Sequence, residues 1–219
     1  MSRLPIAILI SGRGSNMRVI VERAAAGTLP VDVRVVVSDK PSAEGLSLAA
    51  DMNIATRVLE PRDFPDRPAY DRALVELLRQ FQPQLVLLAG FMRILTPQFI
   101  GAFAGRMLNV HPSLLPKYPG LHTHRRCLEA GDAAHGASIH FVTEQLDGGP
   151  VVLQAEVPVV PGDTEITLSA RVQQAEHKIY PQAIDWFARG RLLLQNGRAW
   201  LDGKPLDAPL REPSPAVGG

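Results

Sequence analysis

The sequence has a single cysteine, Cys127, no excess of either charge and no hydrophobic run long enough to cross a membrane. One cysteine excludes an internal disulfide and suits a reducing compartment. A net charge of +1 gives no electrostatic reason to expect nucleic acid or an anionic membrane as a partner. Pro5 and the early glycines argue against a secretory signal. We therefore expect a cytoplasmic protein that acts on small molecules.

The chain has 219 residues, of which 46% are hydrophobic, and this is enough to bury a substantial core. In the first half, short apolar runs alternate with segments whose apolar residues recur at helical spacing. Strands are expected at residues 6–10, 31–37, 55–59, 85–89 and 107–110, and helices after residue 16, over 44–52 and after Asp66. This alternation predicts an α/β fold with a doubly wound, mostly parallel sheet.

The second half departs from this alternation. Two expected strands, 138–142 and 151–157, flank a loop with glycines, which indicates strands of mixed direction. Asp163 or Thr164 is expected to cap a long helix, which Pro181 bends or interrupts. Asn196-Gly197 lies between two short strands and predicts a hairpin. We expect one domain over residues 1–205, followed by a flexible tail over residues 206–219.

The segment over residues 109–116 contains the most informative polar pair, Asn109 and His111, at the end of an apolar run. Side chains two residues apart on a strand project to the same side. An amide and an imidazole that face one spot can bind a polarised carbonyl and transfer a proton. Pro112 and Pro116 prevent a simple continuation as strand or helix, so a stiff loop follows. A buried histidine with a purely structural role remains the alternative.

A glycine-containing loop, residues 12–16, separates the first expected strand from the first helix. Backbone N–H groups at a helix N-terminus can bind phosphate, and Ser15 and Asn16 can add side-chain donors. The spacing matches neither the P-loop nor the dinucleotide-binding pattern. Ser15 can equally act only as a helix N-cap.

Asp147 precedes two glycines, which allow a tight loop. It can serve as a turn residue, or as a carboxylate that lies beside His111 and orients it. Residues 88–95 fit plain core packing, or an apolar slot for a flat heterocycle. Glu176 and Arg67 can be surface charges as well as substrate contacts. His122 and His124 lack the neighbouring ligands that a metal site requires, so no metal is expected.

Taken together, these segments resemble the folate-dependent phosphoribosylglycinamide formyltransferases of the formyltransferase family. The resemblance rests on residues 10–16, 88–95, 109–120, 135–138, 146–150 and 176–181. It spans residues 6 to about 202 in the order of the family. Methionyl-tRNA formyltransferases and formyltetrahydrofolate hydrolases share the Asn, His and Asp group. However, the first typically differ after the equivalent of His111, and the second vary the Pro-Ser that follows it.

The resemblance implies a Rossmann-like formyltransferase fold and a role for each matching residue. The implied catalytic group is Asn109, His111 and Asp147. The implied contacts to phosphoribosylglycinamide come from Gly14, Ser15, Asn16 and Glu176. The implied contacts to the folate come from Arg67, Met92, Arg93, Ile94, Leu95, Thr143, Glu144, Gln145 and Leu146, together with Asn109 and Asp147.

The implied reaction transfers a formyl group from 10-formyltetrahydrofolate, a cosubstrate, to the primary amine of the acceptor, as a step of purine biosynthesis. Asn109 and a protonated His111 would stabilise the oxyanion, and Asp147 would assist proton transfer. The expected partners are small molecules, and the chain is expected to be a monomer or a homodimer. A hydrolase with the same three residues and a non-catalytic nucleotide-binding module are the rival hypotheses.

Overall fold

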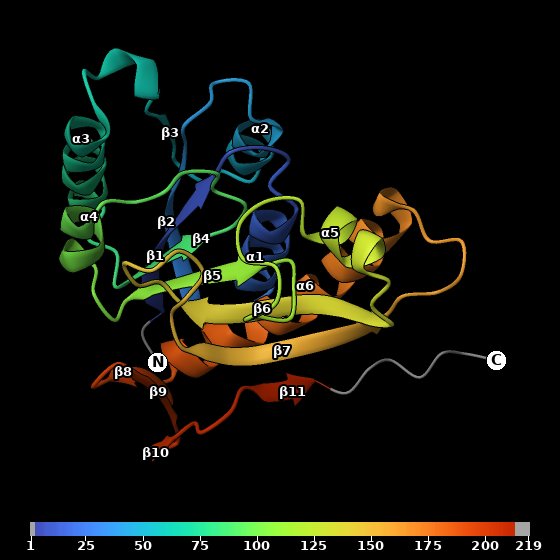
Figure 1. The fold of residues 1–219 in the computed structure, drawn as a ribbon. Coiled ribbons are helices and arrows are strands. Elements are labelled where there is room, and N and C mark those ends of the chain that lie inside the picture. The colour runs from blue at the N-terminus through green and yellow to red at the C-terminus, as the bar shows by residue number, and fades with distance from the viewer. Residues whose placement is uncertain (1–2, 213–219) are drawn as a thin grey trace.

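A computed structural model describes residues 3–212. Its main sheet has the strand order β11-β7-β6-β5-β4-β1-β2-β3 (Figure 1). The strands are β1 (Leu4–Ile10), β2 (Val31–Ser38), β3 (Thr56–Val58), β4 (Leu85–Leu88), β5 (Met107–His111), β6 (Ala134–Phe141), β7 (Val151–Pro158) and β11 (Leu210–Glu212). The β6 strand runs antiparallel to both β5 and β7, while the other neighbours are parallel. The predicted mostly parallel sheet with strands of mixed direction is confirmed.

Helices cover both faces of this sheet, as expected of a doubly wound fold. They are α1 (Ser15–Ala25), α2 (Glu44–Asp51), α3 (Arg67–Gln80), α4 (Pro97–Ala102), α5 (Thr123–Ala130) and α6 (Glu165–Ala188), with a short 3-10 helix at Pro61–Asp63. The first core cluster joins α1, α5 and α6 to one face, and the second joins α3 and α4 to the other. Figure 1 shows α3 and α4 on the side of the sheet opposite α6.

Alternate residues of β1 belong to different cores. Ile6, Ile8 and Ile10 lie in the cluster with α1 and α6, whereas Ala7 and Leu9 lie in the cluster with α3. All five are fully buried, which explains why the sequence shows an unbroken apolar run here rather than an alternating pattern.

The long helix α6 passes through Pro181 without a break, so the predicted interruption is wrong. Thr164 caps it, and the side chains of Thr164 and Thr167 form a reciprocal capping box. An interior proline removes one backbone hydrogen bond and costs about 3 kcal/mol. Residues on both sides of it, among them Val172 and Ile184, are fully buried against the sheet, and this packing offsets the loss.

Two boundaries near the C-terminus differ from expectation. The β6 strand begins at Ala134, four residues before the predicted start at 138. Beyond the predicted domain end at residue 205, Leu210–Glu212 forms β11, which pairs with β7 at the edge of the main sheet. The rest of the predicted tail, residues 213–219, lies outside the described residues. The predicted hairpin is present as β8 (Leu192–Gln195) and β9 (Arg198–Leu201), which form a second sheet with β10 (Lys204–Pro205).

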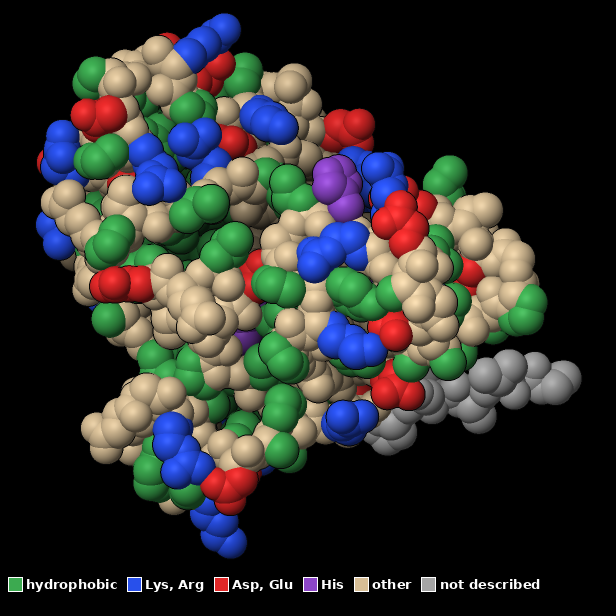
Figure 2. All heavy atoms as spheres, viewed as in Figure 1, with side chains coloured by type: hydrophobic (Ala, Val, Ile, Leu, Met, Phe, Trp, Pro, Cys, Tyr) green, Lys and Arg blue, Asp and Glu red, His purple; other side chains and the backbone are tan. Residues whose placement is uncertain are grey.

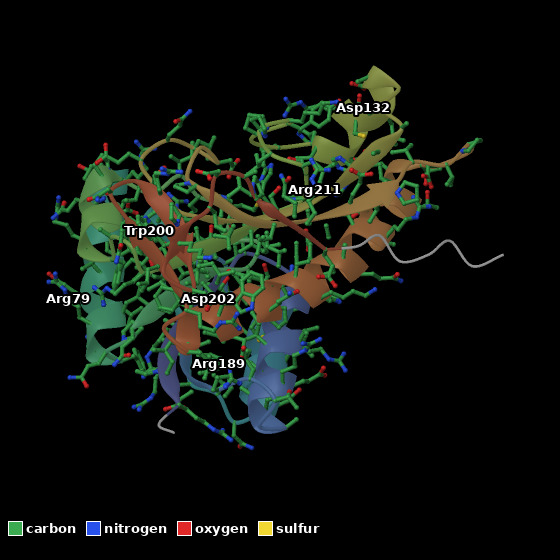
Figure 3. The ribbon with its side chains drawn as sticks, turned by 90° about the horizontal axis from the view of Figure 1, so that it is seen from below. Arg79, Asp132, Arg189, Trp200, Asp202 and Arg211 are labelled. Atoms are coloured by element: carbon green, nitrogen blue, oxygen red, sulfur yellow. The ribbon has the colours of Figure 1, made fainter. Side chains whose placement is uncertain are left out.

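Seen from below, α6 and this second sheet lie side by side under the main sheet (Figure 3). Trp200 lies on β9 and Asp202 in the turn that follows it, and Arg189 lies at the C-terminal end of α6, where the chain enters the second sheet. Arg191 next to it forms a two-point ion pair with Asp202, at 2.7 Å for both contacts. The second sheet thus packs at the C-terminal end of α6.

The order of the strands creates a switch point between β1 and β4. The chain proceeds from β1 outward to β2 and β3, then returns to β4 on the opposite side of β1. Loops that leave the carboxyl ends of β1 and β4 therefore diverge, and ligands of open α/β sheets bind in such crevices. The polar segments identified in the sequence after residues 10, 89 and 109 all lie at this edge.

Candidate active site

Asn109 and His111 lie on the same side of β5, as their spacing predicts. The antiparallel neighbour β6 places His140 directly opposite Asn109 and Ser138 opposite His111. Asn109 Nδ2 lies 3.0 Å from His140 Nε2. His111 and His140 are 5% and 2% exposed, respectively, so the imidazoles are removed from bulk water.

The surroundings of His140 fix its tautomer and, through it, the orientation of Asn109. His140 Nδ1 lies 2.9 Å from the carbonyl oxygen of Phe141, which only accepts, so Nδ1 carries the proton. Burial lowers the pKa of His140 below its usual 6.5, and the ring is neutral at physiological pH. Its unprotonated Nε2 then accepts a hydrogen bond from Asn109 Nδ2. The second N–H of that amide remains available to a substrate.

Asp147 reaches the same place from the loop between β6 and β7, with a left-handed backbone conformation (φ 49°). Its Oδ2 accepts a hydrogen bond of 2.8 Å from the Gly120 N–H and lies 3.5 Å from His111 Nδ1. Its Oδ1 lies 3.8 Å from His140 Nε2. A Cβ atom at Gly149 would overlap the carbonyl of Phe141, so only glycine lets the loop return this closely. The structure therefore brings Asn109, His111 and Asp147 together.

The other ring nitrogen of His111, Nε2, lies 2.9 Å from the carbonyl oxygen of Tyr118. Since that oxygen only accepts, Nε2 carries a proton. Nδ1 therefore faces the Asp147 carboxylate at a distance longer than a strong hydrogen bond. A reacting oxygen that binds beside this pair can accept from Nδ1 when the ring carries a proton on both nitrogens.

The loop after β1 presents the second group of predicted residues. The N-cap residue of α1 is Gly14, which has a left-handed backbone (φ 72°) and no side chain to form a capping hydrogen bond. The interpretation of Ser15 as the N-cap is therefore wrong. Ser15 Oγ accepts from Gln173 Nε2 at 2.9 Å, and Asn16 Nδ2 donates to Glu176 Oε2 at 2.7 Å. The predicted cluster of Gly14, Ser15, Asn16 and Glu176 is thus assembled from α1 and α6.

Glu176 is 8% exposed, and no cation of the described chain pairs with it. Burial raises the pKa of its carboxyl from 4.5 to about 7, an effect that the hydrogen bond from Asn16 opposes. A buried carboxyl whose pKa is raised to near 7, beside two polar side chains, is typical of a functional site. It can accept from a hydroxyl group or pair with an ammonium group.

A cleft lies next to Asn109, with apolar walls and several polar groups at its edge. The predicted folate residues Arg93, Ile94, Leu95, Asn109, Thr143, Glu144, Gln145, Leu146 and Asp147 line it. Two others do not: Arg67 is exposed at the start of α3, and Met92 is 61% exposed. Leu88 and Phe91, which belong to the predicted apolar slot over residues 88–95, also line the cleft, together with Ile100, His140 and Val142, which were not predicted. Polar and apolar residues alternate from Ser138 to Phe141 in the predicted strand 138–142, and this pattern could have identified His140 as a polar residue on one face of that strand.

The face that carries these loops has mixed chemistry. Figure 2 shows acidic and basic side chains interspersed over it, with hydrophobic ones between them and no broad region of one sign. In residues 3–212, no group of three or more His, Cys, Asp or Glu side chains could hold a metal ion. Within the same range, no helix is both long and apolar enough to span a membrane.

Comparison with known proteins agrees with this arrangement. The model of the formyl transferase family matches residues 4–184, most of the chain. A phosphoribosylglycinamide formyltransferase of Escherichia coli is 54% identical over 201 residues, which cover 92% of this chain and 95% of that protein. The corresponding enzyme of Haemophilus influenzae is 45% identical over the same shares of both chains.

Solved structures show the same likeness. The phosphoribosylglycinamide formyltransferase of Coxiella burnetii superposes with a TM-score of 0.92 at 44% identity, and covers 97% of this chain and 100% of its own. A glycinamide ribonucleotide transformylase of Symbiobacterium toebii gives a TM-score of 0.89 at 43% identity, over 91% of this chain and 94% of its own. The chain belongs to the formyl transferase family.

Proposed function

We propose that the protein transfers the formyl group of 10-formyltetrahydrofolate to the primary amine of phosphoribosylglycinamide, as a step of purine biosynthesis. The convergence of Asn109, His111 and Asp147 carries this proposal. Two of these residues lie on β5 and the third on a distant loop, yet they surround one point at the end of an apolar cleft. The names of the relatives support the same acceptor.

The loop around Ser15 suits the phosphorylated acceptor. The left-handed Gly14 exposes backbone N–H groups at the first turn of α1, where the helix dipole favours an anion. Ser15 and Asn16 add a hydroxyl and an amide. Glu176 supplies a carboxyl that can bind the sugar or the glycinamide part.

The cleft beside Asn109 suits the folate donor. Leu88, Phe91 and Ile100 provide apolar walls for a flat heterocycle, and residues 143–147 provide polar backbone groups at its edge. We propose that Arg67 and Met92, which lie outside the lining, contact more distal parts of the donor.

The reaction would proceed by direct transfer. The acceptor amine attacks the formyl carbon, which forms a new C–N bond and places a negative charge on the formyl oxygen. Asn109 Nδ2–H and His111 Nδ1–H would donate to this oxyanion. The proton lost by the amine would pass, with the help of Asp147, to the folate nitrogen as its bond to the carbon breaks. Holding both substrates face to face lowers the entropic part of the barrier.

The decisive experiment mixes the purified protein with 10-formyltetrahydrofolate and follows the deformylated folate by absorbance. We expect it to appear only when phosphoribosylglycinamide is present. Asn109→Ala, His111→Ala and Asp147→Asn should each lower kcat far more than they weaken binding, by about 10²–10³-fold for a lost oxyanion donor.

Three results would contradict the proposal. Release of formate without an acceptor would indicate a hydrolase, and near-normal turnover of His111→Ala would remove that residue from the mechanism. A nucleotide-binding module would give no heat in calorimetry with a folate ligand. We further propose that the protein acts in the cytoplasm on small molecules alone, as a monomer or homodimer.

A further inference from the structure

One short turn contacts both members of the His111–Asp147 pair. The carbonyl oxygen of Tyr118 lies 2.9 Å from His111 Nε2, and the N–H of Gly120 donates to Asp147 Oδ2 at 2.8 Å. Two backbone groups of the same turn thus fix an imidazole and a carboxylate that come from different parts of the chain. The geometry of the pair depends on the conformation of this turn.

That conformation is unfavourable for Tyr118 by itself. Its φ is 56°, in the left-handed region, which costs an ordinary residue roughly 1–2 kcal/mol. Ser113 Oγ donates to the Lys117 carbonyl at 2.6 Å, and contacts of the Tyr118 side chain add to this support of the turn. The phenol oxygen donates to Asp132 Oδ2 at 2.7 Å, and the guanidinium of Arg126 lies 5.2 Å from the ring centre. The edge of the ring meets His135, with ring centres 6.1 Å apart.

Asp132 lies outside the site. It follows the end of α5, and Figure 3 places it at the side of the molecule away from the second sheet. Its hydrogen bonds from Lys117 and Tyr118 lower the pKa of its carboxyl, and the same contact raises the pKa of the Tyr118 phenol. At neutral pH, the carboxylate therefore accepts and the phenol donates.

We propose that Tyr118 and Asp132 are positioning residues, whose hydrogen bond holds the 118–120 turn so that it fixes His111 and Asp147 for catalysis. This inference rests on the proposed function. The Tyr118 carbonyl keeps the proton on His111 Nε2 and prevents rotation of the ring, which directs Nδ1 toward Asp147 and the formyl oxygen. Without the anchor, the turn relaxes toward ordinary φ values, and the carbonyl moves away from the imidazole.

The test compares Tyr118→Phe and Asp132→Ala, which break the same contact from its two ends. The phenylalanine keeps the contacts of the ring with Arg126 and His135. We expect kcat to fall roughly tenfold to a hundredfold in both, because a misplacement of about 1 Å can cost 10²-fold. The KM values for both substrates should stay unchanged, since neither residue lines the cleft or contacts the Ser15 loop. The double variant should be no slower than the slower single variant.

Lys117→Met is the matched control. Lys117 donates to the same Asp132 oxygen at 2.8 Å, but among the contacts of residues 3–212 its ammonium group bonds to neither His111 nor Asp147, so we expect wild-type kcat. A readout independent of turnover is the imidazole ¹H–¹⁵N spectrum. In the wild type, the Nε2–H of His111 should be protected, and in Tyr118→Phe it should exchange faster, with the Nδ1–H tautomer populated.

Wild-type kcat in both variants, with an unchanged His111 spectrum, would overturn the inference. Equal loss of kcat in Lys117→Met would also overturn it, because the ion pair rather than the phenol would then be responsible. If the wild-type protein transfers no formyl group, the proposed function fails. The spectrum still tests the anchor in that case, since it needs no substrate. Should Tyr118→Phe not fold, Asp132→Ala provides both measurements.

Discussion

Replacing Glu176 by Gln should make the protein more stable and a weaker binder of its acceptor. Glu176 is buried, and its pKa in the folded protein is about 7, against 4.5 in the unfolded chain. Between these values the folded state holds a proton that the unfolded state has released. Stability therefore falls as the pH rises from about 4.5 to 7 and stays reduced above that range. Glutamine has the same shape, stays neutral and still accepts from Asn16.

The size of the effect follows from the two pKa values. A difference of about 2.5 pH units, at 1.36 kcal/mol each, corresponds to about 3 kcal/mol at pH 8. For a chain of this length, 1 kcal/mol shifts the melting temperature by about 2–4 °C. Glu176→Gln should therefore melt several degrees above the wild type at pH 8 and close to it at pH 4.5.

Urea denaturation of both proteins from pH 4.5 to pH 8 provides the measurement. We expect the two curves of unfolding free energy against pH to separate progressively up to about pH 7 and then run parallel. Glu129→Gln, which removes an exposed carboxylate on α5, should follow the wild type. A constant difference between wild type and Glu176→Gln over the whole range would refute the reasoning, because the carboxyl would then have the same pKa in both states.

Three further changes test other parts of the structure. Gly45→Ala should raise the KM for phosphoribosylglycinamide and cost about 1–3 kcal/mol of stability, because a Cβ there would lie 2.6 Å from Ile10 Cδ1 and 3.1 Å from Gly14 Cα. An unchanged KM would show that the loop tolerates the shift. Asn16→Ala should raise the same KM with little change in that for the folate, as measured by initial rates. Tyr180→Phe should cost about 1–3 kcal/mol in urea denaturation, since the hydroxyl lies 2.9 Å from the Leu108 carbonyl and 3.1 Å from that of Leu88.

The parts of the site that depend on local sequence could be predicted. Side chains alternate between the two faces of a strand, which placed Asn109 and His111 on the same face. The glycines on either side of residue 13 indicated the turn before α1. The alternation of apolar runs also predicted the doubly wound sheet, since each run had to be buried on both faces.

The parts that depend on pairing between distant segments could not be predicted from residue patterns alone. The position of His140 opposite Asn109 follows from the antiparallel register of β6, which no local pattern encodes. The contact between the Tyr118 carbonyl and His111 arises from a left-handed residue, which sequence patterns assign to glycine or asparagine first. The long helix was predicted correctly, but Pro181 does not interrupt it, because burial along α6 outweighs its local preference.

Within residues 3–212, the main sheet ends on both sides in a short strand of three residues, β3 and β11. A sheet margin with free N–H and C=O groups can recruit strands from other molecules, and short outer strands limit this recruitment. The inner neighbours are longer: β2 and β7 have eight residues each. Removing Leu210–Glu212 would leave β7 as the margin and make it a template for intermolecular association. By this reasoning, a chain shortened before Leu210 should aggregate more readily than the full chain.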